Sequence, residues 1–188
     1  MAVTKSVVLR IRSCNEGENT PLHYGANPLN AEQEDVILDS VLGPEPEEKP
    51  EGVRLLADDE KPADDTVEMT TSALLIEDGG RITLRYRETE LSGLDGAQTE
   101  LSFLASEPGV VTISRTGAVR CTLVLEKGKF HTSAYSISGM ALDMTTAAYR
   151  VNNTLTETGG ELDALYNLRI GAAVTSRIRL QVKILSGN

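Results

Sequence analysis

Two glutamates, one arginine and one threonine are the residues of this sequence whose types and spacing could do chemistry. Glu88 and Glu90 follow an apolar series at every second position that ends at Tyr86. Arg115 lies an even number of residues after Val111 and Ile113, and Thr99 lies an even number before Leu101 and Phe103, so each falls on the same side of a strand as an apolar series. Because alternate side chains of a β-strand point to the same face, parity predicts that all four polar side chains point to a dry interior. Buried charge has to be paired, so we expect them to converge in one cluster.

Three interpretations of this cluster remain open. In the first it is structural: ion pairs and hydrogen bonds close one end of the fold and fix strand register, since unpaired buried charge is costly. In the second it binds a ligand, because small β-barrels commonly enclose one and arginine favours carboxylate or phosphate. In the third it is a hydrolase site that uses Glu88 or Glu90. Neighbours at i and i+2, however, do not oppose each other across a cleft as glycoside hydrolysis requires.

The charge count restricts the ligand that such a site would take. Two glutamates against one arginine leave it neutral or acidic unless burial protonates a carboxyl group. This favours a neutral, partly apolar molecule over a fatty-acid carboxylate. Three tyrosines complete the candidate ligand contacts: Tyr86 on the face of the glutamates, Tyr166 within a later apolar series, and Tyr135 before a glycine-containing turn.

The remaining reactive side chains predict no metal site, no cofactor and no catalytic group. His23 and His131 are far apart in the sequence and have no carboxylate or cysteine at ligand spacing, so we expect surface histidines. Cys121 continues an apolar face and is expected to be an inert core thiol, whereas Cys14 is expected to be more exposed. Glycine pairs lack a strand-to-helix context and are expected in hairpin turns. We therefore expect a protein that is not an enzyme.

Strand periodicity dominates the chain from about Thr66 to the end. Apolar residues recur at every second position, and short glycine-containing turns separate the runs. One solvated face per strand and hairpin connections indicate an antiparallel sheet. With an N-terminal run this gives about eight to ten strands, and closure into a barrel removes the exposed edges. We predict an all-β, antiparallel meander barrel in one domain spanning residues 1–188. The series expected to face inward include Met140, Leu142 and Met144.

The periodicity stops between the first and second strands. Asn30 can cap a short helix whose apolar stripe continues to Leu42, and Gly43-Pro44 ends it. This helix could lie across the barrel mouth or pack on its outside. The stretch after it is acidic and rich in proline, a composition that does not bury enough surface to order itself. We expect a helix and a mobile acidic loop within residues 21–65.

Composition argues against several partners and compartments. The formal net charge of -10 opposes binding to nucleic acid and to anionic membrane surfaces. No uninterrupted apolar stretch is as long as the apolar region of a signal peptide or as a transmembrane helix. The two cysteines are far apart and suit a reducing compartment better than a disulfide framework. We expect a soluble, cytoplasmic protein.

An ordered succession of short motifs resembles a family of small bacterial proteins. Tyr86-x-Glu88-Thr89-Glu90 is followed by Gly96-x-x-Thr99, Arg115-x-Gly117, Glu126-Lys127-Gly128 and Gly160-x-Leu162-x-x-x-Tyr166-x-Leu168. In this pattern the chain is similar to the YwiB-like family of unknown function, over residues 1–13 and from about Val67 to the end. The resemblance implies a lipocalin-like, calycin-type barrel and brings no established activity. The chain departs from the family in two places. Tyr135-Ser136-Ile137-Ser138-Gly139 stands where the family tends to have a Thr-Pro-Tyr-Gly turn after a strand tyrosine, and the acidic segment from about Pro21 to Asp65 is longer than the family's link between its first two strands.

Two functions from different classes fit these observations. The first is a non-enzymatic binding module that takes a small, partly apolar ligand in the lumen or mouth of the barrel. The second is a structural or interaction module, in which side chains fill the barrel and the acidic loop or helix recruits a basic protein partner. A homodimer is compatible with both, and hydrolysis ranks third.

Overall fold

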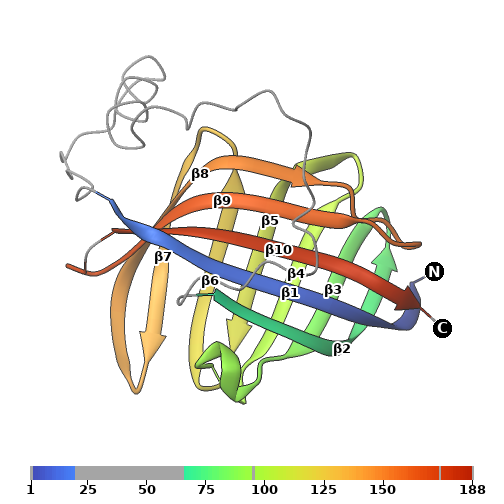
Figure 1. Cartoon of the computed structure of the whole chain (residues 1–188), viewed down its shortest axis with the longest axis horizontal. Helices are drawn as coiled ribbons and strands as arrows, with labels where there is room; N and C mark the ends of the chain where they lie inside the picture. The colour runs from blue at the N-terminus through green and yellow to red at the C-terminus, as the bar shows by residue number, and fades with distance from the viewer. Residues whose placement is uncertain (1, 20–65, 95, 174, 188) are drawn as a thin grey trace.

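Ten β-strands close into one barrel in the computed structural model, which describes residues 2–19, 66–94, 96–173 and 175–187 (Figure 1). Each strand pairs antiparallel with the next, and β1 also pairs with β10, which closes the barrel. The prediction of an all-β antiparallel meander is confirmed. The strands are β1 (Val3–Asn19), β2 (Thr66–Asp78), β3 (Arg81–Arg87), β4 (Gln98–Leu104), β5 (Glu107–Thr116), β6 (Val119–Glu126), β7 (Phe130–Ile137), β8 (Met140–Asn153), β9 (Glu161–Ile170) and β10 (Thr175–Gly187).

Helical structure in the described residues is limited to a single 3-10 turn, η1 (Glu90–Ser92), between β3 and β4. The helix predicted from Asn30 to Leu42 and the predicted acidic loop lie outside the described residues. Within those residues, no helix has the length and apolar character needed to cross a membrane.

The core is built largely from alternate side chains of the strands, as the periodicity predicts, although β7 has no buried residue and β8 is buried continuously from Met144 to Tyr149. In β6, for example, Val119, Cys121, Leu123 and Leu125 are buried, whereas the intervening Arg120 and Thr122 are exposed. Removal of one such leucine side chain from water contributes about 1.5–3 kcal/mol. Buried residues of every strand except β7 join in one apolar cluster, and the partly buried Tyr135 of β7 packs against it.

The strand connections divide between two ends of the barrel. The η1 end carries the β3–β4, β5–β6, β7–β8 and β9–β10 connections, and the opposite end carries the other hairpin turns and both termini (Figure 1). At the η1 end, a Cβ atom on Gly117 would lie 3.0 Å from the carbonyl oxygen of Gly96, so the β5–β6 turn packs directly on the β3–β4 connection.

The prediction that Met140, Leu142 and Met144 all face inward is wrong for the first two of these residues. Met140 is 61% exposed and Leu142 is 40% exposed, whereas Met144 is 2% exposed. The pairing explains the difference, because the last residue of β9, Ile170, lies opposite Met144. The first residues of β8 therefore extend past the end of β9 and pair only with β7, so their alternate side chains have no barrel interior to enter.

Gly160 allows the β8–β9 turn to close. Its φ of +102° is a left-handed value, and an added Cβ atom would lie 2.1 Å from the carbonyl oxygen of Thr154. Gly79 has a φ of +58° but nothing within 4 Å of the same position. We predict that Gly160→Ala lowers the free energy of unfolding by about 2–4 kcal/mol, and Gly79→Ala by about 1 kcal/mol. Urea unfolding of both variants measures this, and equal losses would contradict the role of the Thr154 contact.

Candidate functional site

Four neighbouring strands place one inward row of polar side chains at the η1 end. Tyr86 on β3 lies opposite Thr99 on β4, Thr99 lies opposite Arg115 on β5, and Arg115 lies opposite Cys121 on β6. Antiparallel pairing brings such opposite side chains close together on one face of the sheet. The row therefore follows from strand register and needs no special loop conformation.

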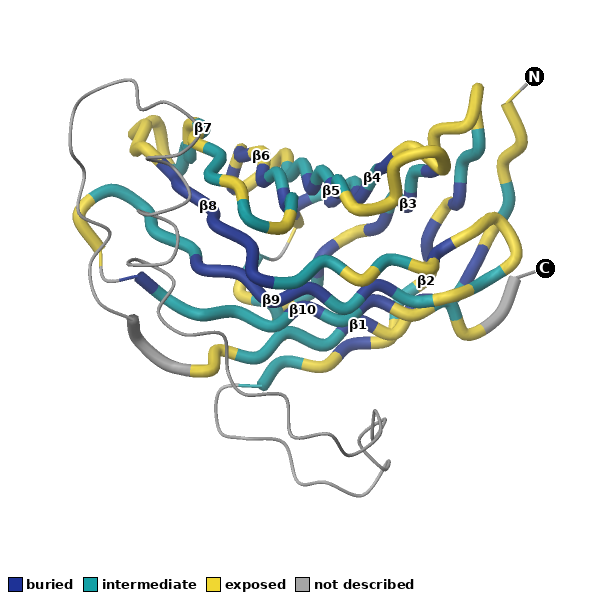
Figure 2. Tube along the Cα trace, turned by 90° about the horizontal axis from the view of Figure 1, so that it is seen from above, coloured by how far each residue is buried: buried dark blue, intermediate teal, exposed yellow. Residues whose placement is uncertain are grey.

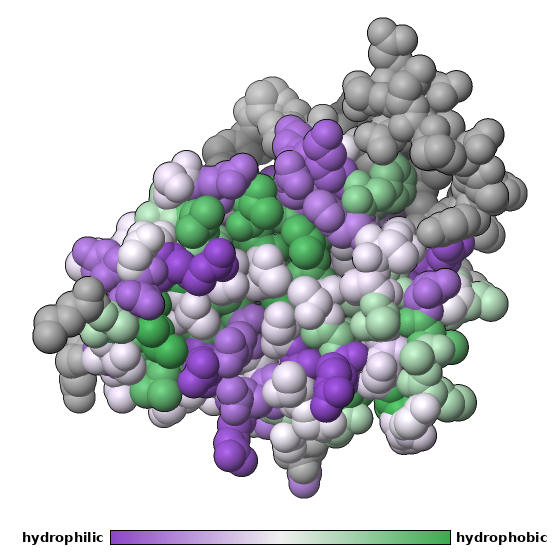
Figure 3. Space-filling view, turned by 180° about the vertical axis from the view of Figure 1, so that it is seen from behind, coloured by the Kyte–Doolittle hydropathy of each residue, from purple (hydrophilic) through white to green (hydrophobic). Residues whose placement is uncertain are grey.

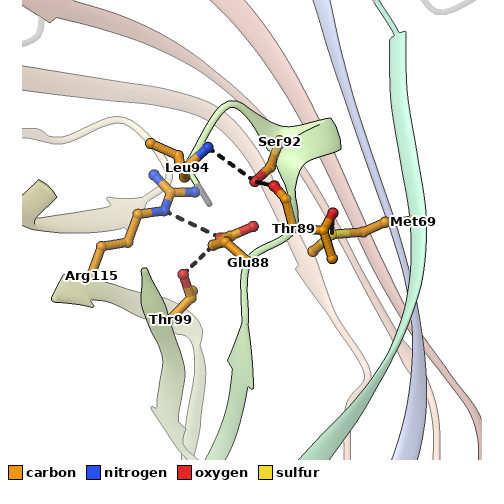
Figure 4. A network of polar contacts seen from close by, with 7 residues as sticks. All are labelled: Met69, Glu88, Thr89, Ser92, Leu94, Thr99 and Arg115. Atoms are coloured by element: carbon orange, nitrogen blue, oxygen red, sulfur yellow. Dashed lines mark hydrogen bonds and ion pairs between the residues drawn. The ribbon is translucent and has the colours of Figure 1, made fainter. Parts of the chain in front are cut away.

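Glu88 extends this row just beyond the end of β3. Its backbone N–H donates a hydrogen bond to the carbonyl oxygen of Ala97 at 2.9 Å, which prolongs the β3–β4 pairing by one step. The Thr99 hydroxyl donates to Glu88 Oε1 at 2.7 Å, and Arg115 Nε lies 3.6 Å from the same oxygen (Figure 4). The Glu88 side chain is only 3% exposed, so its carboxylate depends on these two partners.

The β3–β4 connection covers the cluster with a compact turn. The Ser92 hydroxyl donates to the carbonyl oxygen of Thr89 at 2.8 Å and accepts from the N–H of Leu94 at 3.4 Å. The Thr89 hydroxyl contacts the sulfur of Met69 on β2 at 3.7 Å, which ties the turn to the neighbouring strand (Figure 4). These contacts hold η1 beside the Glu88 carboxylate.

Burial and charge act in opposite directions on Arg115. Burial opposes the positive charge, but the negative charges that Tyr166 and Tyr86 gain when they ionise at high pH, together with the Glu88 carboxylate, outweigh it, so the pKa of Arg115 is raised above its ordinary value. The guanidinium is therefore a permanent cation inside the barrel end. Its Nε atom is buried and has no hydrogen-bond acceptor among the described residues, because the distance to Glu88 exceeds that of a hydrogen bond.

The phenols and the thiol around Arg115 keep their protons. Burial, and then the charge of Glu88, raises the pKa of Tyr86, and burial raises the pKa of Tyr166 despite the nearby Arg115. Burial also raises the pKa of the Cys121 thiol, which Arg115 only partly offsets. Both tyrosines are thus hydrogen-bond donors at neutral pH, and Cys121 is not an activated nucleophile.

The prediction that Glu90 points inward is wrong. β3 ends at Arg87, and the chain turns into η1 at Glu90, whose side chain is exposed. Strand parity applies only while the strand continues, so it holds for Glu88 and fails two residues later. The cluster consequently contains one carboxylate and one guanidinium, and their charges balance.

The structure brings together five of the seven predicted site residues: Tyr86, Glu88, Thr99, Arg115 and Tyr166. Tyr135 lies on β7 opposite Leu142, packs against the edge of the core, and takes no part in the cluster's described polar contacts. Sequence reasoning missed Cys121 as a member of the row. The available signal was the tight turn at Gly117, which sets Cys121 opposite Arg115.

The described residues do not hold a group of three or more histidine, cysteine, aspartate or glutamate side chains that could bind a metal. His131 is half-buried rather than at the surface, and its Nε2 lies 3.3 Å from Glu126 Oε2. This pair links β7 to β6. His23 lies outside the described part of the chain.

Sequence comparison assigns the chain to a family. Residues 54–182 match the model described as "Domain of unknown function (DUF1934)". The chain belongs to this DUF1934 family. The DUF1934 match begins at Arg54 and reaches Val182, so it covers β2 to β9 and most of β10 but not β1. No curated protein matches the sequence.

A solved structure supports the fold of this DUF1934 protein. The crystal structure of the ywiB protein from Bacillus subtilis is similar, with a TM-score of 0.59 and 14% sequence identity. The similarity covers 97% of this chain and 94% of that one. The resemblance to the YwiB-like family is therefore confirmed, and the likeness extends to the fold.

Buried phenols make stability sensitive to alkaline pH. Unfolded tyrosines ionise near pH 10, while Tyr86 and Tyr166 keep their protons to higher pH in the folded state. The folded state then binds more protons, so stability is complete below about pH 10 and falls above it, by up to about 1.4 kcal/mol per pH unit for each phenol.

Urea unfolding between pH 9 and 11.5 measures this slope. We predict that Tyr86→Phe makes the decline less steep than in the wild-type chain. An identical decline in the two proteins would contradict the burial of an un-ionised Tyr86.

Proposed function

We propose that the protein is a lipocalin-like binding barrel that takes a small molecule at its η1 end. The observation that carries this proposal is Arg115, a permanent cation whose buried Nε lacks a hydrogen-bond acceptor among the described residues. A buried donor without a partner costs about 1–3 kcal/mol, and an acceptor atom on a ligand would recover it. Tyr86 and Tyr166 offer two further donors beside it.

Charge balance indicates a neutral ligand. Glu88 already compensates Arg115, so an anionic ligand would add an unpaired negative charge in a poorly solvated site. A carbonyl or ether oxygen accepts from a guanidinium without this cost. The ligand class is therefore a neutral molecule with a hydrogen-bond acceptor at one end.

The next row of side chains indicates that the rest of the ligand is apolar. Immediately deeper in the barrel, Leu84 lies opposite Leu101, which lies opposite Ile113, which lies opposite Leu123. All four are at most 2% exposed. A ligand with a polar end at Arg115 and an apolar remainder against these four aliphatic side chains would match the two adjoining rows.

The same apolar row also favours a second function, in which the barrel is a filled structural module. Side chains as deeply buried as Leu84 and Leu101 pack against one another in the core cluster. In that case Glu88 and Arg115 only hold strand register, and a partner would bind elsewhere. Hydrolysis is not retained, because the exposed Glu90 leaves a single carboxylate in the cluster.

We also propose a cytoplasmic location, which the two free cysteines support. Cys14 is partly buried on β1 and Cys121 is buried on β6. Neither is paired in the structure, as a reducing compartment requires.

A thermal-shift screen of neutral, carbonyl-containing compounds tests the binding function. Arg115→Lys keeps the positive charge beside Glu88 but loses the planar set of donors, and Arg85→Lys makes the same change in the outward pair with Glu100. We predict compounds that stabilise the wild-type chain and Arg85→Lys by about 3 kcal/mol at a hundredfold excess over Kd, with most of this gain lost in Arg115→Lys.

Two results would overturn the binding function. One is a screen in which no compound stabilises the wild-type protein, which would favour the filled barrel. The other is a compound that stabilises Arg115→Lys as much as it stabilises the other two proteins, which would move the site away from Arg115.

A further inference from the structure

The row of side chains beneath Arg115 is closed to solvent. Its four aliphatic members are at most 2% exposed: Leu84, Leu101, Ile113 and Leu123. A ligand that rests on this row, as the proposed binding function requires, reaches it only after some part of the barrel wall has moved. The strand pair with the weakest connection is the place where such a movement costs least.

The weakest connection in the wall lies between β6 and β7. Their backbones pair at Val119 with Ile137 and at Arg120 with Ser136, and the pairing stops there. Among the described strands, the other neighbours in the barrel pair over longer stretches. We call the unpaired stretch, residues 121–126 of β6 and 130–135 of β7, the seam.

Side chains replace the backbone ladder in the seam. The Ser133 hydroxyl of β7 donates to the carbonyl oxygen of Thr122 at 2.7 Å. The Thr146 hydroxyl of β8 donates to the carbonyl oxygen of Val124 at 2.9 Å. Both bonds end on the edge of β6, and each can be exchanged for a bond to water at a small net cost.

The face of β7 that turns to the barrel interior is polar at the seam. Ser133 lies opposite Met144, which belongs to the core, and His131 lies opposite Thr146. The pair of His131 and Glu126 adds a third polar contact between the two strands. β7 has no buried residue, and Figure 2 shows it without the continuous buried stretch of its neighbour β8. Apolar packing therefore adds little to the hold of β7 on β6.

The outer side of the seam is in contact with solvent. The bond between Ser133 and the carbonyl oxygen of Thr122 is exposed. The outer face of β3 to β6, which is seen from behind in Figure 3, mixes hydrophilic with hydrophobic side chains. The outward row that ends at the seam is polar throughout: Arg85, Glu100, Ser114 and Thr122. Water can therefore replace the side-chain contacts of the seam as they separate.

We propose that the barrel opens at the seam, and that this opening is the route by which a neutral ligand reaches the row beneath Arg115. The route rests on the binding function proposed above. Cys121, the first residue of the seam on β6, lies opposite Arg115, and Leu123 of the apolar row follows two residues later. Separation of β7 from β6 would uncover both side chains and leave the ladder between β5 and β6 intact.

The thiol of Cys121 reports this opening. Cys121 is 4% exposed in the closed barrel, and in the variant Cys14→Ser it is the one thiol of the chain. The probe is N-ethylmaleimide, a small neutral carbonyl compound, and mass spectrometry follows its addition to the thiol. We predict labelling whose rate depends only weakly on urea, because local opening exposes little surface. Labelling through global unfolding would carry the full urea dependence of unfolding.

Two serine variants, made in the Cys14→Ser chain, form a matched pair. Ser133 contacts Thr122 across the seam, whereas Ser114 of β5 contacts the Thr122 hydroxyl at 3.3 Å within a paired ladder. We predict that Ser133→Ala speeds the labelling of Cys121 about three- to tenfold, because it removes a hydrogen bond that only the closed seam makes. Ser114→Ala should leave the labelling rate unchanged. Circular dichroism confirms that both variants are folded.

A third variant tests the η1 end as the alternative route. Ser92→Ala removes the hydroxyl that bonds the Thr89 carbonyl oxygen and the Leu94 N–H, and so loosens the connection that covers the cluster. If the barrel opens at the seam, this variant should label Cys121 at the rate of the Cys14→Ser parent.

Three results would overturn the proposal. Labelling with the full urea dependence of unfolding would show that the wall does not open locally. Equal labelling rates in Ser133→Ala and Ser114→Ala would exclude the seam. Faster labelling in Ser92→Ala alone would assign the opening to the η1 end.

The labelling experiment and the thermal-shift screen fail separately. Stabilising compounds that depend on Arg115, found together with a seam that does not open, would retain the binding function and overturn only this route. An opening seam without any stabilising compound would overturn the binding function and the role of the seam as a ligand route.

Discussion

The carboxylate of Glu88 is buried inside the barrel and must stay next to a cation, and the arrangement of the η1 end depends on this constraint. Oε1 of Glu88 accepts from Thr99 at 2.7 Å and lies 3.6 Å from Arg115 Nε. A slip of one residue between β3, β4 and β5 would turn Thr99 and Arg115 to the outside and leave Glu88 unpaired. The ion pair therefore fixes the register of three strands. The same register places Leu84, Leu101 and Ile113 side by side in the next row of the barrel interior.

Two different surfaces result from one alternation of side chains. Inside, the row from Tyr86 to Cys121 lies above an apolar row, an arrangement that the proposed neutral ligand would need. Outside, the odd-numbered residues of β9 and β10 place arginines around Asp163. The strands themselves separate the two surfaces.

Most of the barrel could be predicted from the sequence because period-two alternation is a local property of each strand. The same parity predicted correctly that Glu88, Thr99 and Arg115 point inward. It failed where a strand ends or loses a neighbour: Glu90 lies past the end of β3, and Leu142 lies past the end of β9. Sequence parity carries no information on where pairing stops.

The buried outer surface of β8 and β9 was also beyond prediction from periodicity. A register shift between Ala148 and Arg150 adds one residue to β8, and Tyr149 turns outward against Arg177. A bulge of this kind changes which residues share a face and leaves no clear signature in a single sequence. Asn167 is buried on the same side although its position has the parity of a solvated residue.

A double-mutant cycle on Glu88 and Arg115 measures how strongly the buried ion pair stabilises the barrel. The free energy of unfolding is measured for Glu88→Gln, Arg115→Met and the combined variant, beside the outward cycle Glu100→Gln and Arg85→Met. We predict a coupling of about 2 kcal/mol or more for the inner pair, since removal of one partner leaves a buried charge unpaired. The outer pair, whose side chains are 41% and 37% exposed, should couple by less than about 1 kcal/mol. An inner coupling no larger than the outer one would contradict the role of the buried pair in fixing strand register.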